Sequence, residues 1–278
     1  MRRDKLVPPL GTSSSGRKVA LRMSRCRLAL SLVGLVFGLV ANAEAEWTVR
    51  ESQIDPSILP SVVHLHVVLS DSSSGSEAIL ELAKFPARSS KLHLIDNPDG
   101  ADLASAMSRS DHIAGVNGGY FDENFEPLGL RIRNSKPFSS LVRGRLLTGI
   151  IISTNGTTRI LRASEFGKTS RPATALQCGP FLIDHGQPVA GLDSRRSARR
   201  TFIATTGDQQ VALGCCSEVS LAQLPAILVA WAGDSKIQRA LNLDGGSSTA
   251  FWFKRKDGTV FSKSEQKSVR DFLAVGPR

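Results

Sequence analysis

The chain has 278 residues, 41% of them apolar and 22% charged, which is enough for one well-cored domain or two small ones. Its formal net charge is +10, but residues 1–45 carry eight Lys or Arg against two Asp or Glu, and the remainder carries only +4. That balance suits anionic substrates. It is weak support for nucleic-acid binding, which we do not expect.

The first predicted element is a secretory signal peptide over residues 1–45. A basic stretch precedes an apolar run at 28–40, and Ala43 and Ala45 end two small-x-small cleavage motifs. The apolar run is too short for an ordinary transmembrane helix, although an uncleaved membrane anchor is the alternative, and Met23 is an alternative start. We therefore expect a secreted or periplasmic protein with no stable membrane association after cleavage.

The mature chain is predicted as an N-terminal arm over residues 46–61 and one domain over residues 62–278, because no Pro- or Ser-rich linker divides the latter. Helices are expected over 101–107 and 220–230, with Pro225 kinking the second. These features predict an α+β single domain with a mixed or mostly antiparallel sheet of many short strands and two or three helices. The expected strands lie near 62–69, 92–95, 113–116, 128–132, 146–152, 157–161, 174–183, 201–205, 211–215, 237–243, 249–253, 260–261 and 272–275.

Three cysteines follow the predicted signal peptide, an odd number for an oxidising compartment. A disulfide from Cys178 to Cys215 or Cys216 is one expectation, and a bond between the adjacent Cys215 and Cys216 is the other. Each arrangement leaves one free thiol.

Two segments end an apolar strand in a polar residue and a glycine pair: Asn-Gly-Gly-Tyr at 117–120 and Asp-Gly-Gly-Ser-Ser at 244–248. Glycine reaches positive φ and admits a ligand close to the main chain, and the amides of such a turn can point at an anion. Plain glycine-rich turns are the alternative. Because both segments share one design, we expect them to face one cleft.

Four motifs in this order resemble the phosphodiester glycosidase family: Asn117-Gly-Gly-Tyr-Phe-Asp122, Gln177-Cys-Gly-Pro-Phe181, Arg199-Arg-Thr-Phe-Ile-Ala204 and Asn242-Leu-Asp-Gly-Gly-Ser-Ser248. The likeness runs from about Val62 to the C-terminus. The best-known animal member of that family removes N-acetylglucosamine from mannose-6-phosphate diesters, and many bacterial members are secreted. This chain departs from the family pattern at Ser247, where a third glycine is usual, and at Ala204. The residues of the sugar pocket cannot be matched.

The resemblance implies a hydrolase that cleaves the C1–O bond of a sugar-1-phosphodiester and releases free sugar and a phosphate monoester. A guanidinium can grip the phosphodiester with paired hydrogen bonds, and Arg200 is preferred over Arg199 for this contact. Asp244 would stabilise the developing cation, orient water or form a covalent intermediate. The predicted site comprises Asp244 and Asp122 as catalytic residues, and Asn117, Gly118, Gly119, Tyr120, Gly179, Arg200, Gly245, Gly246, Ser247 and Ser248 as substrate-binding residues.

Some of these residues could instead have purely structural roles. Asp122 is equally explained as a turn residue after Phe121, and Tyr120 as a core residue. A different enzyme class is a serine acyl hydrolase with Ser247 as nucleophile and His185 as base, since residues 245–249 nearly match G-x-S-x-G. A third class is a non-catalytic protein that binds envelope polysaccharide, such as an exopolysaccharide, in the same cleft.

No cofactor is predicted. A divalent cation is compatible with Asp and Asn side chains near an anionic ligand, but no ligand spacing demands one. His64 and His66 share a strand face, yet no third ligand is evident, so they are interpreted as half-exposed strand residues. The expected partner is a carbohydrate phosphodiester; the sequence leaves the oligomeric state undefined.

Overall fold

The computed structural model describes residues 46–154, 156–167 and 171–278. The predicted signal peptide over residues 1–45 and its cleavage sites lie outside the described residues. Within the described ranges, no helix combines the length and apolar character that crossing a bilayer requires.

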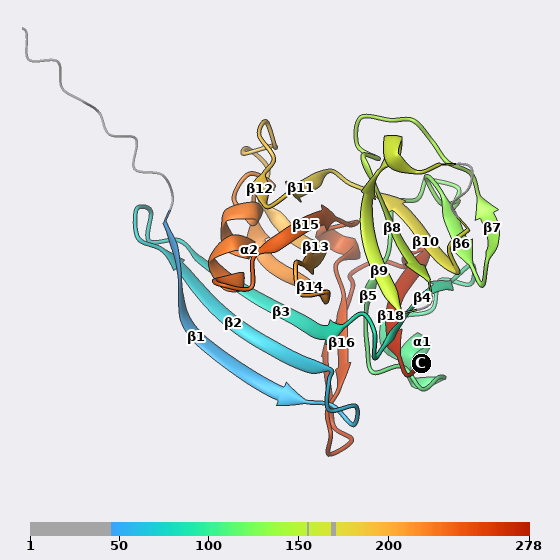
Figure 1. Cartoon of the computed structure of the whole chain (residues 1–278), viewed down its shortest axis with the longest axis horizontal. Helices are drawn as coiled ribbons and strands as arrows, with labels where there is room; N and C mark the ends of the chain where they lie inside the picture. The colour runs from blue at the N-terminus through green and yellow to red at the C-terminus, as the bar shows by residue number, and fades with distance from the viewer. Residues whose placement is uncertain (1–45, 155, 168–170) are drawn as a thin grey trace, which may run out of the picture. The chain divides into compact units, whose positions relative to one another are not determined.

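The largest sheet has eight strands, and every neighbouring pair in it is antiparallel. Figure 1 shows β1, β2 and β3 extending side by side away from the rest. In spatial order the strands are β1 (Trp47–Pro56), β2 (Val63–Asp71), β3 (Glu77–Pro86), β14 (Gln210–Val219), β13 (Ala198–Thr206), β15 (Ile237–Asn242), β11 (Phe181–Asp184) and β12 (Gln187–Pro188).

Two five-stranded antiparallel sheets complete the strand structure (Figure 1). The first runs β7 (Lys136–Ser139), β6 (Arg131–Arg133), β10 (Thr174–Cys178), β8 (Gly149–Thr154) and β9 (Thr157–Arg162). The second runs β17 (Val260–Lys263), β16 (Phe251–Lys254), β5 (Ala114–Asn117), β18 (Asp271–Gly276) and β4 (Lys91–Asp96).

One apolar cluster joins the three sheets. It contains Phe85 from β3, Leu176 from β10 and Phe253 from β16, all fully buried. Burial of large apolar side chains on this scale is the main stabilising contribution to such a fold. The cluster therefore fixes the strand ends from which the candidate site is built.

Within the described residues, two helices cover the sheets, each with a clear sequence cause. Helix α1 (Leu103–Ser108) begins after Asp102, whose carboxylate accepts from the amide of Ser105. Helix α2 (Leu224–Ala232) packs on the eight-stranded sheet, and Pro225 lies in its first turn. The expected kink at Pro225 is wrong, because the helix starts four residues later than predicted and its first turn tolerates proline.

The mostly antiparallel sheets and two helices confirm the coarse fold prediction, with β structure dominating over α. The segment expected as an arm instead forms the edge strand β1, paired with β2 along its length. Its side chains are almost all exposed. Backbone pairing rather than burial therefore holds β1, and hydrophobic periodicity gives no signal for that.

The three cysteines are buried free thiols, so neither predicted disulfide forms. Cys215 belongs to the cluster that joins the sheets, whereas Cys216 packs in the cluster under α2. Successive side chains of a strand point to opposite faces, which separates these two sulfurs. Burial raises the pKa of both Cys178 and Cys215 to about 12, which makes them poor nucleophiles.

Candidate functional site

The two glycine-pair segments lie against each other. Strand β15 ends at Asn242, and residues 243–249 turn from it into β16, with the 3-10 helix η2 over Gly246–Ser248. The amide of Asp244 donates to the carbonyl oxygen of Gly118 over 3.1 Å. A turn of the eight-stranded sheet therefore touches the end of β5, which belongs to another sheet.

Asn117 fixes this junction from the end of β5. Its fully buried side chain donates from Nδ2 to the carbonyl oxygen of Asp244 (2.7 Å), and its Oδ1 accepts from Thr201 Oγ1 (2.7 Å) and the Ala250 amide (3.0 Å). Both polar atoms thus have protein partners. The contacts give Asn117 a structural role in which one amide holds three segments together.

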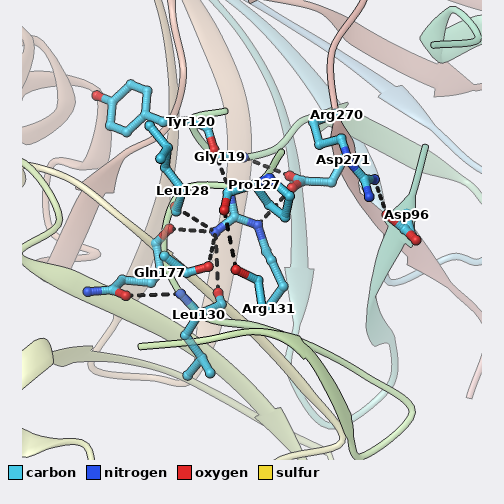
Figure 2. Close-up of polar contacts among 12 residues, drawn as sticks. Asp96, Gly119, Tyr120, Pro127, Leu128, Leu130, Arg131, Gln177, Arg270 and Asp271 are labelled. Atoms are coloured by element: carbon cyan, nitrogen blue, oxygen red, sulfur yellow. Dashed lines mark hydrogen bonds and ion pairs between the residues drawn. The ribbon is translucent and has the colours of Figure 1, made fainter. Parts of the chain in front are cut away.

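A buried ion pair supports the first glycine pair (Figure 2). Arg131 and Asp271 are both fully buried, and Arg131 Nε donates to Asp271 Oδ2 over 2.7 Å. The other carboxylate oxygen accepts from the Gly119 amide (2.8 Å), and the guanidinium donates to the carbonyl oxygens of Tyr120 (3.1 Å) and Gln177 (3.0 Å). This network orders the turn that precedes Tyr120. Arg131 lies in the strand expected over 128–132, where no role was predicted for it; a charged residue inside an apolar strand was the available signal.

Tyr120 extends from that framework towards the second turn. Its hydroxyl donates to the carbonyl oxygen of Gly179 (2.7 Å) and accepts from Asn242 Nδ2 (3.1 Å). Burial, with the negative charge of Asp244 nearby, raises the Tyr120 pKa well above its ordinary value, and the charge of Arg200 opposes the rise. Tyr120 is therefore a neutral hydroxyl close to both charged residues.

Asp244 is a half-buried carboxylate at the start of the turn. Its Oδ1 accepts from the amide of Gly245 over 2.9 Å. Burial raises its pKa above the ordinary aspartate value, while the Ser248 hydroxyl, Lys267 and the Gly245 amide act in the opposite direction. Raised carboxylate pKa values are common at sites of acid–base chemistry.

Arg200 is a buried cation without a carboxylate partner. Its side chain is only 8% exposed; Nε donates to the Val219 carbonyl oxygen (2.9 Å) and Nη2 to that of Arg196 (2.6 Å). Within the described residues it forms no ion pair, and Nη1 makes no hydrogen bond. Burial lowers its pKa, which is the cost of an isolated charge out of water. An anionic ligand would offset that cost.

Arg199 lies directly against the second glycine turn. Nε donates to the carbonyl oxygen of Gly246 (3.3 Å) and Nη1 to that of Ser264 (3.4 Å). Alternation along β13 sends the side chains of Arg199 and Arg200 to opposite faces of the strand. The two arginines predicted as first choice and alternative thus lie near the turn from different sides.

Unpartnered polar atoms gather at this turn. Seven buried side-chain nitrogen or oxygen atoms lack a hydrogen bond among the described residues, and four of them belong to residues in or touching the segment 242–249. Because buried polar groups are nearly always hydrogen-bonded, such a cluster points to ligand contacts. The four atoms are Asn242 Oδ1, Ser248 Oγ, Thr249 Oγ1 and Arg199 Nη2. Ser248 Oγ lies near enough to the Asp244 carboxylate to lower its pKa but makes no hydrogen bond of normal geometry to it.

Asp122, the second predicted carboxylate, is committed to a local turn. Its Oδ1 accepts from the amides of Asn124 and Glu126, both over 2.9 Å. These bonds close the loop after Phe121. The geometry matches the turn alternative for Asp122 and shows no hydrogen bond from it to the second glycine turn.

The serine hydrolase geometry is absent. Ser247 is exposed and its carbonyl oxygen accepts from the Gln266 amide (2.7 Å). His185 instead contacts Arg239 Nη2 (3.0 Å), near the start of β15, since the neighbouring Gly186 amide bonds Gln238. Ser247 follows the opposite end of that strand, so His185 cannot serve it as a base.

Two large cavities lie away from the second glycine turn. One of 660 Å³ is lined by polar residues that include Arg159, Gln238 and Arg239, and one of 610 Å³ lies under the loop after β7. A smaller cavity of 240 Å³, lined in part by residues 264–268, is next to the turn, because Gln266 bonds Ser247. The candidate site is therefore a surface turn with buried polar atoms beneath it.

Within the described part of the chain, no group of three or more His, Cys, Asp or Glu side chains is arranged to hold a metal ion. His64 and His66 both bond the buried carboxylate of Glu81, each over 2.9 Å. His64 is buried rather than half-exposed, which corrects the sequence interpretation. Its ring lies between the aromatic rings of β16 and β17, so its environment is a core.

The profile of the phosphodiester glycosidase family matches residues 110–276 of this chain. A comparison with curated proteins finds no match. Among solved structures, a hypothetical protein from Synechocystis is similar with a TM-score of 0.61 and 15% identity, over 78% of this chain and 62% of that one. The zebrafish N-acetylglucosamine-1-phosphodiester alpha-N-acetylglucosaminidase catalytic domain, auto-inhibited by its pro-peptide, is similar with a TM-score of 0.59 and 17% identity, over 82% of this chain and 88% of that one.

These likenesses agree with the geometry described above. Structural similarity at such low identity establishes the fold alone, whereas the family profile spans more than half of the chain and contains both glycine turns. The chain belongs to the phosphodiester glycosidase family.

Proposed function

We propose that this protein is a secreted or periplasmic hydrolase that cleaves the C1–O bond of a sugar-1-phosphodiester. The products are the free sugar and a phosphate monoester. Family membership supports the glycosidase class, and the composition of residues 1–45 supports export. The name of the zebrafish relative suggests N-acetylglucosamine as the first sugar to test.

The observation that carries this proposal is the set of unpartnered buried polar atoms around the second glycine turn. Asp244 lies within the segment 242–249, and Asn242 joins that segment to Tyr120 by donating to its hydroxyl over 3.1 Å. Arg200 is buried, lies next to Gly245, whose would-be Cβ is 3.8 Å from the Arg200 Cα, and has no carboxylate partner among the described residues. A sugar phosphodiester offers one negative charge and several hydroxyls within a short distance. Its charge complements Arg200, and its hydroxyls complement Ser248 and Asn242.

The chemistry needs only one well-placed carboxylate. Breaking the C1–O bond expels a phosphate monoester, which leaves as an anion and requires little help from a general acid. Asp122 is occupied by its turn, which leaves Asp244 as the candidate group at the anomeric carbon. Its raised pKa makes the Asp244 carboxylate a stronger base than an ordinary aspartate, which suits removal of a proton from the attacking water.

A panel of methyl sugar-1-phosphate diesters, in α and β forms and with N-acetylglucosamine first, tests the proposal. We expect the purified protein to release reducing sugar and methyl phosphate in equal amounts. Asp244→Asn should slow release by about 10²–10³-fold without unfolding the protein, whereas the matched Asp122→Asn should retain activity if it folds. Proton NMR of the first sugar anomer released separates inversion by activated water from retention through a covalent intermediate. A well-folded protein that cleaves no member of the panel would contradict the proposal.

The non-catalytic, polysaccharide-binding alternative was predicted in the cleft of the two glycine turns, and one observation favours a different location for it. The 660 Å³ groove is lined by Arg159, Arg239 and several glutamine and threonine side chains, a composition that suits a polar polysaccharide. Binding of an acidic polysaccharide without turnover, reduced by Arg159→Gln and unaffected by Asp244→Asn, would favour that reading.

A further inference from the structure

Several apolar side chains are exposed on and next to the loop that joins β7 to β8. Among the described residues, ten large apolar side chains are exposed, and five of them fall between residues 128 and 146. Leu146 is 63% exposed. Single exposed apolar residues are common, but a group within one short segment marks an interaction surface. The five side chains are Leu128, Phe138, Leu141, Val142 and Leu146.

All charged side chains of the same segment are basic. Residues 128–162 contain no Asp or Glu at all. Arg133, Lys136, Arg143 and Arg145 are exposed, and none of them forms an ion pair within the described residues. Basic side chains interleaved with leucine, valine and phenylalanine therefore face the solvent together, a composition that suits an anionic surface with an apolar interior.

A cavity of 610 Å³ lies beneath this loop. Its lining includes the apolar side chains of Leu141, Val142, Leu147 and Phe166 and two cations, Arg143 and Arg162. Such a cavity fits an acyl chain or headgroup better than a free sugar, because most of its lining residues offer no hydrogen bonds.

Gln177 fixes the loop to the buried network around Arg131 and Asp271, because its carbonyl oxygen accepts from Arg131. We call this network the frame of the candidate site. Gln177 Nε2 donates to the carbonyl oxygens of Val142 (2.6 Å) and Leu147 (3.1 Å), and its Oε1 accepts from the Val142 amide (3.1 Å). A Cβ atom on Gly179 would collide with the carbonyl oxygen of Leu146, so these backbones touch. Gly179 in turn accepts from the Tyr120 hydroxyl. The loop is therefore adjacent to the candidate site.

We propose that residues 138–147 form a docking surface for an anionic lipid bilayer. Leu141, Val142 and Leu146 would enter the interface, and Arg143 and Arg145 would lie at the headgroup level. An acidic polysaccharide would pair with the arginines but would leave the three apolar side chains in water, so the bilayer is favoured. The contact is reversible and involves no spanning segment. It brings Tyr120 and Gly179 close to the membrane surface, where lipid-linked sugar phosphates are located.

Vesicle co-sedimentation tests the docking surface. The purified protein, lacking residues 1–45 so that any signal peptide is removed, should bind vesicles of phosphatidylglycerol and phosphatidylcholine at low salt, and bind pure phosphatidylcholine at least tenfold more weakly. The double variant Arg143→Gln, Arg145→Gln should reduce vesicle binding by roughly 30-fold, because each of the two arginines adds a similar electrostatic attraction to the anionic membrane surface. Leu141→Ser with Leu146→Ser should also reduce binding at least tenfold. Thermal unfolding confirms that each variant folds.

A matched control separates this surface from general stickiness. Ile54→Ser and Val260→Ser remove exposed apolar side chains elsewhere, 63% and 46% exposed, and should leave vesicle binding unchanged. Equal binding to neutral and anionic vesicles, or no binding to either, would overturn the proposal. Loss of binding in the arginine variant with no change in the leucine variant would identify a polyanion site instead, which also contradicts it. None of these outcomes depends on hydrolase activity.

Discussion

The two glycine-pair segments look alike in sequence and differ in what their hydrogen bonds do. Around Gly118 and Gly119, the amides are bonded to Asp271 and the missing side chains make room for the Arg131–Asp271 pair. Around Gly245 and Gly246, buried polar atoms of neighbouring residues have no partners. Completed hydrogen bonds mark the frame and uncompleted ones mark the candidate site, a distinction that the letters of the sequence do not contain.

The glycines themselves serve different purposes. A Cβ on Gly118 would collide with the Asp271 carboxylate, so this glycine is required for packing. Gly246 has φ of +63° and nothing within 4 Å of its would-be Cβ, so it is required for the turn and borders open space. A ligand can therefore approach the second turn at Gly246, whereas Gly245 is packed against the carbonyl oxygen of Arg199, and both glycines of the first turn are closed in by the Arg131–Asp271 pair.

The largest expected effect is on the frame. Asp271→Ala leaves Arg131 buried without its counter-ion and should lower the free energy of unfolding by about 3–5 kcal/mol. Arg133→Ala, exposed on the same strand β6, should change it by less than about 0.5 kcal/mol. Urea unfolding followed by circular dichroism measures both. Similar small losses for the two variants would show that the ion pair does not stabilise the frame.

Asp244→Asn should lower activity and leave stability intact, in contrast to Asp271→Ala. We expect a rate loss of about 10²–10³-fold, or roughly 3–4 kcal/mol of barrier. Because burial raises the Asp244 pKa in the folded state, its ionisation opposes folding, and the variant should be as stable as the native chain or more stable at neutral pH. The stability difference should vanish below the ordinary aspartate pKa, where both folded and unfolded carboxyls are protonated. Marked destabilisation at pH 7 would instead make Asp244 part of the frame.

Adding a single methyl group to one glycine of each turn compares the frame with the candidate site directly. Gly118→Ala should cost about 1–3 kcal/mol or more, because the new methyl group displaces a buried carboxylate. Gly246→Ala should cost about 1 kcal/mol for its positive φ and leave the core unchanged. Thermal unfolding of the pair measures the difference. The reverse order of costs would contradict the assignment of frame and site.

Substitution of the two arginines tests which of them binds the phosphodiester. Arg200→Lys should raise KM for the phosphodiester about tenfold, since lysine cannot form paired hydrogen bonds with a phosphoryl group. Arg199→Lys should have the smaller effect, because Arg199 already donates to the carbonyl oxygens of Gly246 and Ser264. Steady-state kinetics at fixed salt provide the measurement. Equal changes in KM would contradict the choice of Arg200.

The smallest expected effect concerns pH. Activity that requires ionised Asp244 should rise with pH through its raised pKa. The charge of Lys267 lowers that pKa, so Lys267→Met should move the acid limb of the kcat/KM profile to higher pH. Lys256→Met, at an exposed position in the turn between β16 and β17, is the control. An unchanged limb in Lys267→Met would indicate that another group titrates.

Much of the fold was predictable because its strands have regular apolar patterns. The strand expected over 62–69 appears as β2 and that expected over 272–275 as β18. Strand β3 was not predicted, because Glu81 and Lys84 interrupt its apolar pattern. Glu81 is buried only because two histidines and Lys263 pair with it, and partners far apart in sequence leave no local signal.

The site was predictable in its residue types but not in their division of roles. The approach of the second glycine turn to the first could be expected from their shared design, and the contact from Asp244 to Gly118 agrees with it. The commitment of Asn117 to Thr201 and Ala250, and of Asp122 to its own turn, depends on tertiary contacts. Arg131 was missed because its significance lies in Asp271, 140 residues later.

A crystal structure of the Asp244→Asn variant with a methyl sugar-1-phosphate diester tests the central claim most directly. We expect phosphoryl oxygens within hydrogen-bond distance of Arg200 and Ser248, and the anomeric carbon beside residue 244. A diester bound instead in the groove lined by Arg159 and Arg239, with the second glycine turn untouched, would contradict it.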